Sequence, residues 1–212
     1  FSLNDAHVHR HPAAEDDEAD HDAVVAKPGG QGHNIMVAVR CRGLNPEERH
    51  GGQRSIIRVT AGKTVILEDP QTTAADDYLR INKSKERHYT FDHAFDEAAD
   101  TRQVYERTAR ILIGSVLQGF NATVFAYGAT GAGKTHTMLG NPSSPGIMML
   151  TLQDLFCEVA TQREERQFEV KCAFLEVYNE NIRDLLRPEA DYLDIREDPV
   201  KGMCVAGISE VG

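Results

Sequence analysis

Short apolar runs alternate with amphipathic stretches over most of the chain. Residues 34–42 are apolar on both faces up to two arginines, and residues 122–127 form a second run of this kind. Both runs predict strands buried in a sheet that is covered on both sides. Alternation or β-branched residues predict further strands over residues 55–60, 64–68, 89–95 and 168–178.

Helices are expected between these strands. One begins at Asp100 or Thr101 and runs to about Gln118, before Gly119. A second follows the strand that ends at residue 127, a third covers residues 147–161, and a short helical turn is expected over residues 181–186. Because strands alternate with helices, the sequence predicts an α/β fold with a largely parallel or mixed sheet.

The first 33 residues lack this pattern. They contain seven acids and two bases and end in a glycine-rich stretch. Such a segment cannot bury enough apolar surface to offset its ordering entropy, so residues 1–33 are expected to be a disordered acidic tail ahead of a folded part over residues 34–212. Three histidines alternate within this segment, and they leave two alternatives open, a contact with a metal or a solvated polar tail. They are His7, His9 and His11.

Composition excludes several classes of protein. The 212 residues carry a net charge of −10, which argues against a generic nucleic-acid binder because such a protein needs a basic field. No apolar run reaches the roughly 18 residues of a membrane span, and no secretory signal opens the chain, so no membrane association is expected. The four cysteines form no Cys-x-x-Cys pair, which indicates reduced thiols in a cytosolic protein.

Residues 128–135 carry the one motif with recognisable chemistry. They fit Gly-x-x-x-x-Gly-Lys-Thr at every fixed position and lie between a predicted strand and a predicted helix. Backbone N–H groups are expected to cradle nucleotide phosphates, while Lys134 neutralises the β- and γ-phosphates and the Thr135 hydroxyl ligates Mg²⁺. Lys134 and Thr135 are therefore the candidate catalytic residues. The alternative is a glycine-rich turn without a ligand. The expected binding residues of the loop are Gly128, Ala129, Thr130, Gly131, Ala132, Gly133, Lys134 and Thr135.

Residues 136–212 lack the second half of such a site. Hydrolysis also needs a carboxylate at the end of a buried strand to hold Mg²⁺ from its other side. The available aspartates are all expected in helices or loops: Asp154, Asp184, Asp191 and Asp194. The sequence therefore contains half of an NTPase site.

Four ordered blocks resemble kinesin motor domains. They are residues 89–95, the P-loop block 119–138, the Phe-Leu-Glu-Val-Tyr-Asn-Glu segment that opens residues 174–186, and residues 193–198 with 205–208. Shorter cues, among them residues 76–80 and 145–147, resemble the kinesin-8 subgroup. The resemblance covers residues 34–212 and stops before the family's switch I, switch II and neck linker. It therefore implies a partial kinesin motor domain, a P-loop NTPase with a mixed central sheet flanked by helices and incomplete at the C-terminus.

The resemblance also implies an activity. It indicates a microtubule motor that uses ATP and Mg²⁺ to drive movement along microtubules or their depolymerisation. Such a protein is expected in the cytoplasm on the microtubule cytoskeleton, dimerising through a stalk. Residues 1–212 alone are expected to be inactive because the switches are missing. Two alternatives stay open: a truncated, non-catalytic module that binds tubulin or nucleotide, and an unrelated P-loop kinase.

Residues outside the P-loop are assigned by the same resemblance. Arg40, Arg42 and His136 are carried over as contacts on the base side of the nucleotide. Family motors have Arg-x-Arg-Pro where Gly43 follows Arg42 here, and the loss of the rigid proline ring predicts weaker base discrimination. A cationic loop resembles the one that faces the microtubule in kinesin-8 motors, with a solvated loop as the alternative: Arg80, Lys83, Lys85 and Arg87.

Overall fold

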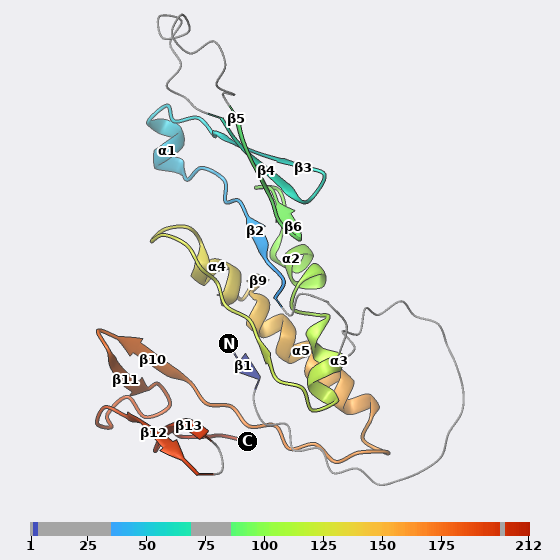
Figure 1. Ribbon diagram of the computed structural model, residues 1–212, viewed down its shortest axis with the longest axis vertical. Helices are drawn as coiled ribbons and strands as arrows, with labels where there is room; N and C mark the ends of the chain where they lie inside the picture. Colours follow the sequence, from blue (N-terminus) through green and yellow to red (C-terminus); the bar gives the residue numbers. More distant parts are fainter. Residues whose placement is uncertain (1, 4–34, 69–85, 200–201) are drawn as a thin grey trace, which may run out of the picture.

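The computed structural model describes residues 2–3, 35–68, 86–199 and 202–212 (Figure 1). Of the expected tail only Ser2–Leu3 is described. It forms strand β1, which pairs antiparallel with β7 (Ala122–Thr123). The rest of residues 1–33, with the three histidines, lies outside the described residues, so the disordered tail stays a prediction and the two alternatives for the histidines stay open.

A parallel pair of strands stands where the sequence predicts the first buried strand. β2 (Ala38–Arg40) pairs with β6 (His93–Phe95). The expected burial of the whole segment is wrong, because the side chains of residues 35–37 are exposed. These residues precede β2, and among the described residues β6 is the only strand that pairs with β2, so one edge of β2 is left open.

A three-stranded antiparallel sheet lies at the upper end of the molecule in Figure 1. Its order is β3 (Ile57–Thr60), β4 (Thr64–Glu68) and β5 (Glu86–Thr90). The expected turn between β3 and β4 is confirmed by the positive φ angles of Ala61 (55°) and Gly62 (64°). The single strand expected over residues 89–95 is wrong. The chain leaves this sheet at residue 91, whose N–H donates to the carbonyl of Lys63 (2.9 Å), and continues as β6.

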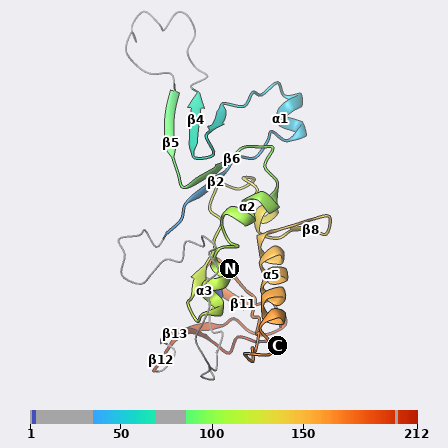
Figure 2. The same ribbon diagram turned by 90° about the vertical axis from the view of Figure 1, so that its right-hand side faces the viewer.

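Three helices lie close together in both views (Figures 1 and 2), and their side chains supply most of the main hydrophobic core. They are α2 (Thr101–Arg107), α3 (Leu112–Leu117) and α5 (Ile147–Thr161). The expected bounds of α5 are confirmed. The expected start of α2 is confirmed too, because Asp100 caps it by accepting from the N–H of Gln103 (2.7 Å). The buried core residues are Phe95, Val104, Tyr105, Ala109, Ile113, Leu117, Ile147, Leu150, Leu155 and Val159.

The single helix expected over residues 101–118 is two helices. α2 ends at Thr108, where φ is −127° and the side-chain hydroxyl donates to the carbonyl of Val104 (2.6 Å). Tyr105, 1 % exposed, joins α2 to α5 by donating to Oδ2 of Asp154 (2.7 Å). Burial and this hydrogen bond raise the pKa of Tyr105. The chain therefore leaves the helical path at Thr108, just after the turn that Tyr105 holds against α5.

The segment that leads to the P-loop differs from its prediction. Residues 124–127 form no strand, and Phe125 and Tyr127 are 76 % and 95 % exposed. Residues 122–127 are apolar enough for a buried strand. In the described part of the chain, however, the only strand that pairs with this run is β1, and it pairs only with β7 at its start. α4 (Lys134–Met138) follows. A hairpin of β8 (Gly140–Asn141) and β9 (Ser144–Pro145) then joins α4 to α5.

Two hairpins close the chain. β10 (Leu175–Tyr178) pairs with β11 (Asn181–Asp184), and β12 (Asp194–Asp198) pairs with β13 (Gly202–Ala206). The helical turn expected over residues 181–186 is wrong. Asn179 and Glu180 take positive φ angles of 49° and 64°, which reverse the chain and place the next residues in a strand. The strand expected over residues 168–178 is confirmed only in its last part.

Strand pairing across the described residues is mixed. Six small sheets are present, and β2–β6 is the one parallel pair among the paired strands of these sheets. None of the helices in the described ranges is long and apolar enough to span a membrane.

Candidate nucleotide-binding site

The P-loop runs from the exposed segment after β7 into the first turn of α4. Gly131 and Gly133 take φ angles of 81° and 91°, which only glycine adopts without strain, and a Cβ at either position would meet nothing within 4 Å. The N–H of Ala132 donates to the carbonyl of Ala129 (3.1 Å), and that of Thr137 donates to the carbonyl of Gly133 (3.0 Å). A turn at residues 129–132 therefore leads directly into α4, with open space beside Gly131 and Gly133.

Donors and a cation meet at this turn. Nζ of Lys134 donates to the carbonyls of Gly128 (2.8 Å) and Ala129 (3.0 Å), so the ammonium already lies over the loop. Within the described residues, no protein acceptor pairs with the backbone N–H of Gly131, Gly133 or Thr135. Thr135 is exposed, so its hydroxyl is accessible. Free amides, an ammonium and a hydroxyl are the donor set that fits a nucleotide triphosphate with Mg²⁺.

Arg40 connects the end of β2 to α4. Its guanidinium donates to the hydroxyls of Thr101 (3.0 Å) and Thr137 (3.1 Å) and to the carbonyl of Ala99 (3.1 Å). Desolvation by burial lowers its pKa, partly offset by the charge of Asp100. The carried-over role of Arg40 as a base contact therefore competes with three protein acceptors.

Arg42 is also engaged. It donates to both carboxylate oxygens of Glu48 (2.8 and 2.7 Å), the residue that completes the cap of α1 (Pro46–His50) together with Asn45. The hydrogen bond from Arg42 lowers the pKa of Glu48 to about 2. α1 was not among the elements expected from the sequence, although Asn45 and Glu48 three residues later are the signal of a capping box. His136, the third carried-over base contact, is exposed on α4.

Gly43 lies against an acidic side chain. A Cβ at this position would lie 2.9 Å from Oε2 of Glu97, the flexible end of that side chain. We expect Gly43→Pro to displace this carboxylate and to raise the affinity for ATP relative to GTP, because the ring supplies a rigid apolar surface. Equilibrium binding of both nucleotides checks this. Gly43→Pro combined with Glu97→Ala separates the effect of the ring from that of the carboxylate, and unchanged affinities for both nucleotides would refute the expectation.

The cationic loop is described only at its end. Arg80, Lys83 and Lys85 lie outside the described residues, so their proposed surface stays a prediction. Arg87 lies in strand β5 rather than in a loop, because it pairs with Leu67 of β4. It is exposed, so its charge faces solvent.

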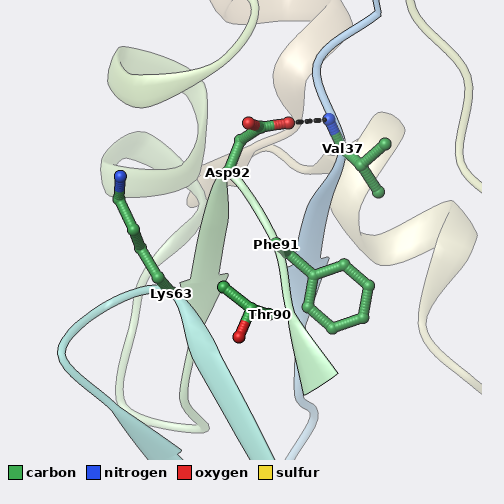
Figure 3. Close-up of a pocket in the computed structure, with 5 residues that line it drawn as sticks. All are labelled: Val37, Lys63, Thr90, Phe91 and Asp92. Atoms are coloured by element: carbon green, nitrogen blue, oxygen red, sulfur yellow. Dashed lines mark hydrogen bonds between the residues drawn. The ribbon is translucent and has the colours of Figure 1, made fainter.

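A pocket of about 520 Å³ lies apart from the P-loop, where β2 begins beside β5 and β6 (Figure 3). Its lining residues are Val37, Lys63, Thr90, Phe91 and Asp92. Oδ2 of Asp92 accepts from the N–H of Val37 (2.8 Å), as the dashed line in Figure 3 shows. This hydrogen bond holds the residue just before β2 against Asp92. None of the candidate nucleotide-binding residues lines the pocket.

Asp184 has a role that the sequence did not reveal. It ends β11, a strand and not the helix or loop expected, and is 3 % exposed. Its carboxylate accepts from the N–H groups of Ser209 and Leu186 (2.8 Å each). Contacts with Ser209, and then with Leu186, lower the pKa of Asp184. The carboxylate therefore links the end of β11 to the segment that follows β13.

Comparison with known proteins decides the family. Residues 40–212 match the family model of the kinesin motor domain. The chain belongs to the kinesin motor domain family. It is 46 % identical over 179 residues to the kinesin-like protein KIN-8B of Arabidopsis thaliana, a match that covers 84 % of this chain and 21 % of that protein. It is 46 % identical over 177 residues to human kinesin-like protein KIF19, covering 84 % of this chain and 18 % of that protein.

A solved structure of a fast kinesin matches this kinesin chain with a TM-score of 0.73 at 28 % identity, covering 84 % of the chain and 48 % of the solved one. The expected family, its α/β P-loop NTPase fold and the likeness to kinesin-8 proteins are confirmed by these matches. The chain spans about a fifth of the length of the curated relatives named above.

Proposed function

We propose that the protein carrying this chain is an ATP-dependent microtubule motor of the kinesin-8 kind, and that residues 128–135 bind the phosphates of Mg-ATP. One observation carries the proposal: Gly131 and Gly133 hold an open loop with unpaired amides next to Lys134 and Thr135. This arrangement suits a polyphosphate rather than a neutral ligand.

Each side chain of the loop has a separate task in this proposal. The ammonium of Lys134 exchanges the carbonyls of Gly128 and Ala129 for phosphate oxygens, which are stronger acceptors because they are charged. The hydroxyl of Thr135 binds Mg²⁺, and His136 lies one residue further along α4 on the base side. When held there, Mg²⁺ would supply positive charge against the phosphates for transfer of the γ-phosphoryl group to water. The amides of Gly131 and Gly133 orient the phosphates.

Microtubules are the proposed partner, and the cytoplasm is the proposed location. The protein is proposed to dimerise through a stalk outside this sequence. The solved structure of a fast kinesin is described as having "implications for ATPase mechanism and interactions with microtubules". For this chain, the cations Arg80, Lys83, Lys85 and Arg87 are proposed to face the acidic surface of tubulin, so binding should weaken as salt rises. The alternative is a non-catalytic module that binds tubulin or nucleotide.

The test is ATP hydrolysis by the complete protein, measured with and without microtubules. We expect Mg²⁺-dependent turnover that microtubules accelerate, and no turnover by residues 1–212 alone. Nucleotide or tubulin binding without turnover in the complete protein would favour the non-catalytic module. Phosphorylation of a nucleoside monophosphate would instead indicate a P-loop kinase.

A further inference from the structure

The guanidinium of Arg40 is shared among three acceptors, one on α2, one on α4 and one in the segment just before α2. Nη1 donates to Thr101 Oγ1 (3.0 Å) and Thr137 Oγ1 (3.1 Å), and Nη2 donates to the carbonyl of Ala99 (3.1 Å). Thr101 is 2 % exposed and opens α2, whereas Thr137 is half-buried on α4. A planar guanidinium suits such a set because its N–H groups have fixed directions. Arg40 therefore ties α4 to the buried start of α2.

This contact lies two positions beyond Thr135, the last residue of the P-loop. The N–H of Thr137 donates to the carbonyl of Gly133 (3.0 Å), and Gly133 is the left-handed residue that immediately precedes α4. α4 has only five residues and no side-chain cap at its first turn. A helix this short is marginal by itself, so its position depends on tertiary contacts. The hydrogen bond from Arg40 to Thr137 is one such contact.

We propose that Arg40 is a positioning residue for the phosphates, which acts through Thr137 to hold α4 and the last turn of the P-loop in place. The inference rests on the proposed nucleotide site. It differs from the carried-over role, in which Arg40 touches the base. A base contact affects only nucleotides with the favoured base, whereas a residue that holds the P-loop affects every ligand that carries the triphosphate.

The experiment compares three ligands that share the triphosphate and differ in the base. Isothermal titration calorimetry gives the dissociation constants of Mg-ATP, Mg-GTP and Mg-tripolyphosphate for the complete protein and its variants. We expect Arg40→Lys to weaken all three by the same factor, about tenfold, because a lysine ammonium cannot serve both threonines and the carbonyl together. Thr137→Val should reproduce this loss, and Thr137→Ser, which keeps the hydroxyl, should bind like the unaltered protein.

A matched variant controls for general loss of stability. Arg166 is also half-buried and donates to a backbone carbonyl, that of Leu117 (3.4 Å), away from the P-loop. We expect Arg166→Lys to lower the melting temperature without changing the three affinities. If Arg40→Lys does not fold, the pair Thr137→Val and Thr137→Ser carries the test.

The outcomes separate this assignment from the proposed function. A non-additive loss in the double variant Arg40→Lys/Thr137→Val supports the route through Thr137. A loss for Mg-ATP but not for Mg-tripolyphosphate makes Arg40 a base contact and overturns the assignment alone. Additive losses, or normal binding by Thr137→Val, overturn it too. If the unaltered protein binds none of the three ligands, the proposed nucleotide site fails, and the assignment fails with it.

Discussion

Replacement of Lys134 by alanine should reduce ATP turnover by the complete protein by at least about a hundredfold. The substitution removes the only side-chain cation that the described structure places on the P-loop carbonyls, at 2.8 and 3.0 Å from those of Gly128 and Ala129. Charge that develops on the phosphates would then lack a positioned counter-charge. Steady-state hydrolysis of Mg-ATP in the presence of microtubules measures the effect.

A second lysine provides the control for this prediction. Lys171 is exposed and pairs with Glu169 (3.1 Å) in the segment before β10. Lys171→Ala removes the same charge and side chain, and we expect turnover to stay at the level of the unaltered protein. Equal rates for the two alanine variants would contradict the proposed role of Lys134.

Substitution of Gly146 by alanine should destabilise the fold by about 3 kcal/mol. Gly146 precedes α5, and its N–H donates to the carbonyl of Leu139 (3.0 Å) at the end of α4. A Cβ at this position would overlap the backbone carbonyl groups of Met138 and Leu139, which cannot move aside as a flexible side chain can. The hairpin β8–β9 would open, and α4 would lose its contact with α5. Equilibrium chemical denaturation, with the folded and unfolded baselines both fitted, measures the change in the free energy of unfolding.

Gly114 is the matched control for Gly146. It lies inside α3, is exposed, and a Cβ there would meet nothing within 4 Å. We expect Gly114→Ala to leave stability unchanged or to raise it by up to about 1 kcal/mol, because alanine favours the helix over glycine. If Gly146→Ala proved as stable as Gly114→Ala, the close approach of the two backbones would be refuted.

Local chemistry was enough to predict several elements. The bounds of α5, the cap of α2 by Asp100 and the turn at Ala61–Gly62 each depend on residues within a few positions of one another. The P-loop belongs to this class as well, because its glycines and Lys134 act within eight consecutive residues. Short-range rules therefore apply to these segments without knowledge of the rest of the chain.

Partners distant in the sequence decided the remaining elements. The predicted strand 89–95 is interrupted where the N–H of residue 91 donates to the carbonyl of Lys63, a partner well before it in the chain. Within α2, Tyr105 is held by Asp154 of α5, which lies 49 positions later. Asp184 could not be assigned because its acceptor role depends on Ser209, far along the chain. No local pattern records such pairings.

Sequence by itself determined the candidate phosphate-binding loop of this kinesin chain: its glycines, its cation and its hydroxyl are adjacent residues, so their types and spacing suffice. Only the tertiary structure decided what Arg40 does. It reaches Thr137, which lies 97 positions later in the chain, whereas Arg42 pairs with Glu48, which lies only 6 positions later. The physical reason is that a guanidinium binds whichever acceptors the folded backbone brings within about 3 Å, and that choice is made by packing and not by neighbours in the sequence.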